Sequence, residues 1–178
     1  MKLNTLFVVG VCASALLASC NPVKTGNERQ LANNNTTLID GDAYQFFQKV
    51  SARAVYEHDQ AAYVAQVATS SQAKQVAAKA EEVYGALIPV LDSLATVNQV
   101  DFPIKGAAKF DAASLDSTFS DEAYVQHVQE ETAIVKGQIE RMAHDTDKGL
   151  RAFAHQYQES VNELFTLAGG KAEAHGHH

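Results

Sequence analysis

The sequence predicts an all-α protein, an antiparallel four-helix bundle in which two helical hairpins are joined by a long crossover. In four separate stretches, apolar side chains recur at steps of three and four residues, the period of an amphipathic helix. Short polar turns follow the first and third stretches, whereas the longer segment 98–119, in which the period fades, separates the second from the third. No stretch alternates as a half-buried strand does. Two hairpins with one long crossover form the topology of ferritin-like bundles.

The first hairpin is expected from about residue 42 onward. Its first helix should cover about 42–69, and Ser70 or Ser71 then offers an N-cap for the second helix. Pro89 falls inside the second helix, where we expect a bend without a break, because the ring removes one backbone donor while the apolar pattern continues past it. The residues expected to face the core are Ala43, Phe46, Phe47, Val50, Ala54, Ala61, Val64, Ala65 and Ala68, then Ala73, Val76, Ala80, Val83, Leu87, Leu91 and Leu94.

The crossover and the second hairpin follow. Pro103 and Gly106 mark the crossover as a connection. Ser120 reads as the N-cap of the third helix, and two acidic residues follow it in the first turn, where the helix dipole favours negative charge. A short turn at 145–147 leads to the fourth helix, which two glycines end. The residues expected to face the core here are Tyr124, Val125, Val128, Thr132, Val135, Ile139 and Met142, then Leu150, Phe153, Tyr157, Val161, Leu164 and Ala168.

The N-terminus has the pattern of an export signal. Lys2 precedes an almost unbroken apolar run over 6–17, which has the length of a signal-peptide core and is too short to span a bilayer. The run ends in "LASC", which resembles the lipobox of bacterial lipoproteins, where the cysteine sulfur takes a diacylglyceryl group before cleavage. An ordinary secretory signal that happens to contain a cysteine is the alternative. We expect a lipoprotein signal peptide over 1–19, a lipidated Cys20 with a flexible linker over 20–40, the bundle over 41–169 and a disordered histidine-containing tail over 170–178.

Cysteine usage and charge narrow the function classes. Cys12 leaves with the signal and lipidation consumes Cys20, so the mature chain has no thiol for a disulfide, a thiolate metal site or a cysteine nucleophile. Loss of Lys2 takes the formal charge from −7 to −8, and an acidic chain argues against nucleic acid as a partner. An acidic surface also repels anionic lipid, so the acyl chains on Cys20 are expected to attach the protein to the membrane. Asn21 is not the aspartate that retains enterobacterial lipoproteins at the inner membrane, so the resemblance implies an outer membrane lipoprotein that faces the periplasm.

Several short stretches resemble a bacterial family. They are "AKQVAAKA" at the start of the second helix, "VDFP" after it, "AY" at the start of the third and "LRAFA" at the start of the fourth. In these features the chain is similar to a domain-of-unknown-function family of exported, ferritin-like four-helix proteins, often labelled outer membrane proteins. Family members commonly carry three histidines at positions that hold Tyr84, Thr132 and Leu164 here, whereas the usual glutamate of the first helix is matched by Glu57.

Two glutamates are candidate site residues. Glu57 lies on the core face of the first helix, and a buried carboxylate must be neutral, paired or coordinating. A hydrogen bond to Tyr84 or to a facing side chain is the structural alternative. Glu131 takes a similar place in the third helix, so the two glutamates, with His58 or His127 nearby, could form a metal site. No Glu-x-x-His pair occurs, which argues against a ferritin-like di-iron centre.

The remaining histidines are weaker candidates. His175, His177 and His178 lie in the terminal "HGHH", which can bind a transition metal weakly, or is simply a tail with opportunistic affinity. His127 with Glu130 or Glu131, His155 with Glu159 and Glu140 with His144 have helical spacing, which solvated surface pairs also show.

The sequence is compatible with two functions. Searches for a phosphate loop, a nucleophile elbow and a zincin motif find none in the sequence. The first expectation is therefore a non-catalytic, lipid-anchored structural or interaction module of the bacterial cell envelope, with an envelope protein as its partner and no cofactor. The alternative is a metal-binding or metal-storage protein that uses the buried carboxylates and the histidine tail.

Overall fold

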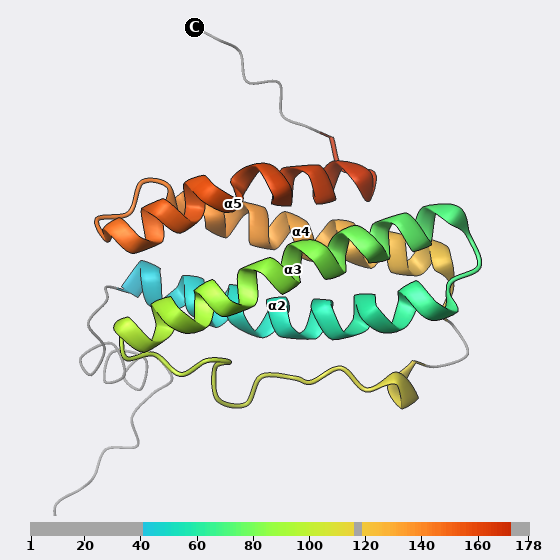
Figure 1. Cartoon of the computed structure of the whole chain (residues 1–178), viewed down its shortest axis with the longest axis horizontal. Coiled ribbons are helices and arrows are strands. Elements are labelled where there is room, and N and C mark those ends of the chain that lie inside the picture. Colours follow the sequence, from blue (N-terminus) through green and yellow to red (C-terminus); the bar gives the residue numbers. More distant parts are fainter. Residues whose placement is uncertain (1–40, 116–118, 172–178) are drawn as a thin grey trace, which may run out of the picture.

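The computed structural model describes residues 41–115 and 119–171, and they form a four-helix bundle (Figure 1). The predicted signal peptide, Cys20, the predicted linker and the tail histidines lie outside the described residues. The long helices are α2 (Gly41–Val67), α3 (Ser71–Val97), α4 (Asp121–Met142) and α5 (Lys148–Leu167), with a short 3₁₀ helix η1 (Ala112–Ser114) in the crossover. The predicted all-α bundle of two hairpins and one crossover is confirmed. None of the described helices is long and apolar enough to cross a membrane.

Side-chain caps start three of the four helices at the predicted places. Ser70 accepts a hydrogen bond from Ala73 N at the start of α3. Ser120 does the same for Ala123 N at the start of α4, and Asp147 caps α5 by accepting from the third residue of that helix. Each cap satisfies one of the backbone N–H groups that a helix start leaves without a partner. The starts of these three helices are therefore determined by a capping residue directly before each helix.

The first helix ends at Val67, two residues before the expected end at Thr69. The backbone N–H of Thr69 donates to Asp121 Oδ2 at 2.9 Å, and the Thr69 hydroxyl donates to the same oxygen at 2.7 Å. The N–H of Ser70 is a third donor to it. The α2–α3 turn is thus tied to the first residue of α4, and these hydrogen bonds replace the ones that a further half-turn of α2 would make.

Two other predicted features of the helices are present. Helix α3 continues past Pro89 to Val97, as expected for a proline that does not break the helix. Helix α5 is followed by Gly169 with a φ of +97°, a left-handed conformation that favours glycine. A Cβ on the next residue, Gly170, would lie 2.4 Å from the Phe165 ring, so both glycines fit the end of this helix.

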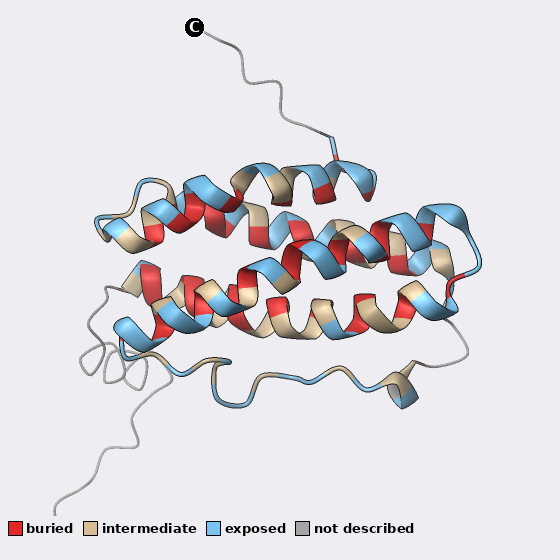
Figure 2. Ribbon diagram, viewed as in Figure 1, coloured by how far each residue is buried: buried red, intermediate tan, exposed pale blue. Residues whose placement is uncertain are grey.

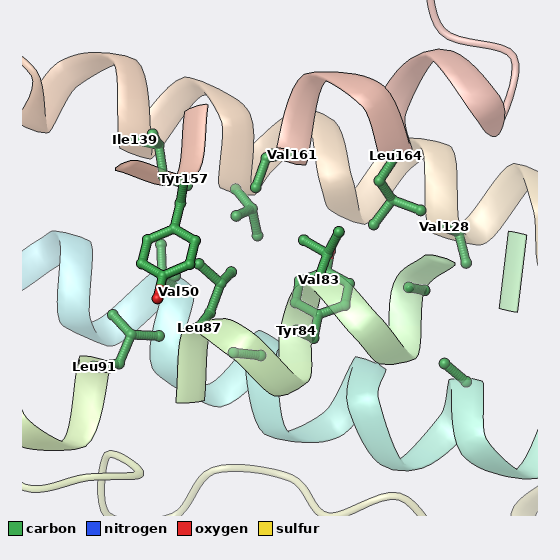
Figure 3. Close-up of a cluster of buried hydrophobic side chains, with 14 of the residues drawn as sticks. Val50, Val83, Tyr84, Leu87, Leu91, Val128, Ile139, Tyr157, Val161 and Leu164 are labelled. Atoms are coloured by element: carbon green, nitrogen blue, oxygen red, sulfur yellow. The ribbon is translucent and has the colours of Figure 1, made fainter. Parts of the chain in front are cut away.

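The core lies along the axis of the bundle, where all four helices contribute buried faces (Figure 2). Figure 3 shows part of it, with Val50 of α2, Leu87 and Leu91 of α3 and Tyr157 of α5 in one group, and Val83 of α3, Val128 of α4 and Leu164 of α5 further along the bundle. Nearly every residue that was expected to face the core is buried. The exceptions are Ala65, Leu94 and Val125, which are partly buried at its edge.

The crossover also packs against the bundle. It runs alongside α2 (Figure 1), and the ring of Phe110 lies 5.8 Å from that of Tyr56 and 5.7 Å from that of Tyr63. Val100, Phe102 and Ile104 pack against the core from the same segment. Because these contacts lack a regular period along the crossover, the sequence pattern did not reveal them.

Candidate functional site

The candidate site lies where α2 and α4 face each other. Arg53 Nε donates to Glu131 Oε2 at 2.6 Å. One helical turn away along the same interface, His127 Nε2 lies 3.0 Å from Glu57 Oε1. The steps of four residues run in opposite directions along the two helices, as antiparallel neighbours require. We call these four side chains, Arg53, Glu57, His127 and Glu131, the polar seam.

Glu57 is the buried member of the polar seam. Its side chain is 3% exposed, whereas that of His127 is 36% exposed. Burial raises the pKa of the Glu57 carboxyl, and this effect outweighs the hydrogen bond from His127, which lowers it. The same hydrogen bond is the main cause of the raised pKa of the His127 imidazole, and it outweighs partial burial, which lowers that pKa. The pair therefore holds a proton more tightly in the folded protein than its two groups do in water.

Glu131 does not share the environment expected for it. Its side chain is 24% exposed, and its carboxylate binds the Arg53 guanidinium, which also donates from Nη1 to the backbone carbonyl of Lys49. The expectation that Glu131 resembles Glu57 in its setting is thus wrong, because Arg53 rather than Glu57 lies level with it across the seam. The two glutamates are held by different partners one turn apart.

His58 lies outside the polar seam. Its Nδ1 is 3.2 Å from Asp59 Oδ1, and its ring packs against Gly85 of α3, where a Cβ would come within 3.3 Å of the imidazole. Among the other expected helical pairs, Glu140 is bound by Lys136 at 2.6 Å. Of the metal candidates within the described residues, the structure therefore brings only Glu57 and His127 into contact.

Buried hydroxyl groups lie beside the polar seam. Tyr84 OH and Thr132 Oγ1 are 3.2 Å apart, so Tyr84 pairs with Thr132 and not with Glu57. The structural alternative for Glu57, a hydrogen bond to Tyr84 or to a facing side chain, is met by the facing His127. Both residues stand at positions where the resemblance implies histidines. Burial raises the pKa of the Tyr84 and Tyr124 hydroxyls, and the nearby charge of Glu57 adds to it in both cases. Both phenols thus stay protonated and neutral.

Two polar atoms near the polar seam are buried without a hydrogen-bond partner. They are the hydroxyl of Tyr124, whose residue is 2% exposed, and Oε1 of Gln60, whose residue is 6% exposed. In the register set by Glu57 and His127, Gln60 comes one turn later on α2 and Tyr124 one turn earlier on α4, so the two residues are level. In the described part of the chain, no group of three or more His, Cys, Asp and Glu side chains is placed to hold a metal ion.

Sequence reasoning missed Arg53, Gln60 and Tyr124 as parts of this region. Arg53 precedes Glu57 by four residues and Gln60 follows it by three, spacings that place all three on one helix face. Tyr124 has the same relation to His127. A search for polar residues at these spacings from each buried candidate would have found them, although it could not have paired them across the seam.

Comparisons of the chain with protein-family models, curated proteins and solved structures find no match.

Proposed function

We propose that the protein is a lipid-anchored lipoprotein of the bacterial cell envelope, whose four-helix domain is a non-catalytic structural or interaction module. The observation that carries the proposal is the "LASC" sequence directly after a signal-peptide core, which supplies Cys20 as the lipidated residue. Stable anchoring needs two membrane signals, and the diacylglyceryl group of a lipoprotein provides two acyl chains. The proposed location is the periplasmic face of the outer membrane.

The bundle supports a module that works through its surface. Two of its interior titratable groups are hydrogen-bonded, Glu57 with His127 and Tyr84 with Thr132. A general acid or base must reach a substrate, whereas the Glu57 carboxylate is buried against a neighbouring helix. The partly exposed Glu131 is bound by Arg53. These pairings favour a stabilised scaffold over an active site.

The test is lipid labelling of the full chain in a bacterial host. Cells grow with an alkyne-bearing fatty acid, and label and membrane association are compared for the wild type, Cys20→Ala and Cys12→Ala. Cys12→Ala is the matched control, because it removes the other cysteine of the chain from within the signal. We expect label and membrane association in the wild type and in Cys12→Ala, and loss of label in Cys20→Ala. A wild type without label, or label that survives Cys20→Ala, would overturn the proposal.

Metal binding by the same domain is a second candidate function. The observation that favours it is the pair of unpartnered buried oxygen atoms beside Glu57 and His127.

A further inference from the structure

The interior beside Glu57 contains two oxygen atoms that take part in no hydrogen bond. A buried polar atom without a partner costs about 1–3 kcal/mol, so native structures contain few of them and each calls for an explanation. Here two such atoms occur on facing helices, Gln60 Oε1 and the Tyr124 hydroxyl oxygen. The amide oxygen can only accept, and the neighbouring Glu57 is an acceptor when ionised. The Tyr124 phenol also carries an O–H donor, but both oxygens have free lone pairs that can bind a cation or accept from a water molecule.

These groups belong to one region of the bundle. Glu57 is paired with His127 across the α2–α4 interface, and Tyr124 precedes His127 by three residues on the same side of α4. Gln60 follows Glu57 on the same side of α2, level with Tyr124. His127 lies on the solvent side of the region and is 36% exposed, so an ion or water molecule can approach the region past its ring.

The geometry of the Glu57 and His127 pair fits two ligands of one ion. Bonds of about 2.0–2.1 Å from an ion to an imidazole nitrogen and to a carboxylate oxygen place those two atoms roughly 3 Å apart. His127 Nε2 and Glu57 Oε1 are 3.0 Å apart. An ion between them would displace the proton that they share. Imidazole together with oxygen ligands suits first-row divalent metals such as Zn²⁺.

We propose that the α2–α4 interface binds one divalent transition-metal ion through His127 Nε2 and the Glu57 carboxylate, with the Tyr124 hydroxyl, Gln60 Oε1 and water as the remaining ligands. Since no third His, Cys, Asp or Glu side chain of the described residues joins this pair, the other ligands must be neutral oxygens. Arg53 neutralises Glu131 and keeps that carboxylate out of the site. The site rests on the second candidate function, metal binding, which it makes specific, and it is independent of lipidation at Cys20.

The experiment uses the full chain purified in detergent, with His175, His177 and His178 replaced by Ala so that the tail cannot bind metal. Zn²⁺ is titrated by calorimetry, and Co²⁺ is titrated by visible absorption, which reports on ligand geometry. We expect one ion per chain in this background. Because a lost ligand should cost more than the 10–100-fold typical of an outer-shell partner, Glu57→Gln and His127→Ala should each weaken binding at least about tenfold. His155→Ala, which removes an exposed histidine of α5, is the matched control and should bind as the parent does.

The outcomes separate clearly. If the parent with the substituted tail binds no stoichiometric metal, the proposal is overturned. This result does not depend on whether any site variant folds. Binding that persists in both Glu57→Gln and His127→Ala, with unchanged circular dichroism, would also overturn it. Tyr124→Phe retains the ring and removes only the hydroxyl, so weaker binding supports Tyr124 as a ligand and unchanged binding removes it from the set.

Discussion

The α2–α4 and α3–α5 interfaces of the bundle differ in character. Across the first, Arg53, Glu57, His127 and Glu131 form two charged pairs. Across the second, the core contacts are largely apolar, and the Tyr157 hydroxyl donates to the Ala86 carbonyl at 3.1 Å. Its charged pair, Lys79 with Glu163 at 3.0 Å, lies at the solvent-facing edge, where Glu163 is 56% exposed. Apolar burial stabilises a fold without geometric precision, whereas a buried charged pair contributes little net stability. We infer that, of these two interfaces, α3–α5 contributes more to stability, whereas α2–α4 contains the buried charged pair.

The largest effect should come from a cavity at the apolar interface. Leu87 is fully buried on α3, and Leu87→Ala should lower the free energy of unfolding by about 2–5 kcal/mol, because the lost contacts add to the cost of the cavity. Urea unfolding of the full chain, followed by circular dichroism, measures this. Val97→Ala on the same helix is the control, since Val97 is 68% exposed and should change stability by less than about 0.5 kcal/mol. Equal effects at the two positions would contradict the assignment of stability to this interface.

A second change tests whether the polar pair is retained at the expense of stability. Replacement of a buried pair by apolar residues of similar volume is often neutral or stabilising by about 1–4 kcal/mol. For Glu57→Met combined with His127→Leu we expect the lower part of that range, because His127 is 36% exposed. The same urea experiment measures it. A double variant that is clearly less stable than the wild type would show that the pair itself holds the helices together.

The polar seam should also make stability depend on pH. The pKa values of Glu57 and His127 are both raised in the folded protein, so the folded state binds more protons than the unfolded state. The resulting stabilisation is complete below the unfolded pKa values, 4.5 and 6.5, and is lost as the pH rises through the higher folded values. The charged and titratable groups that interact with this pair are Arg53 and Tyr56 of α2, Tyr84 of α3, and Tyr124, Glu130 and Glu131 of α4.

Urea midpoints at about pH 5.5 and about pH 8 measure this dependence. We expect the lower midpoint at the higher pH, and a smaller difference in Glu57→Gln, which has no carboxyl to titrate. Asp121, whose pKa is lowered by its hydrogen bonds from Thr69 and Ser70, gives the opposite trend only near and below its unfolded value of 3.8. A midpoint that rises with pH in the wild type would contradict the pKa directions given for the pair.

The smallest effect should be at the outer pair of the same interface. Arg53 and Glu131 are 30% and 24% exposed, so solvent screens their attraction. A double-mutant cycle of Arg53→Ala and Glu131→Ala should give a coupling free energy of about 0.2–1 kcal/mol. A coupling well above this range would mean that the outer pair, and not the apolar interface alone, stabilises the bundle.

The sequence predicted the fold closely where the signals were local. Ser70 and Ser120 start helices as expected, Pro89 lies inside a continuous helix, and Glu57 is buried as its helical position indicated. The prediction was less accurate where a distant residue intervened. Asp121 ends α2 early by accepting the Thr69 N–H from 52 residues away, and no pattern within α2 contains that information.

The sequence by itself determined the four helices, their caps, their buried faces and the candidate lipidation site, because each follows from neighbours within a few turns of the chain. Only the tertiary structure decided which polar groups meet. Glu57 and His127 are 70 residues apart and Arg53 and Glu131 are 78 apart, so their pairing depends on the register between two packed helices. A shift of one turn would bring the two glutamates level. Packing of the apolar faces fixes that register, and it thereby gives Glu57 an imidazole as its partner.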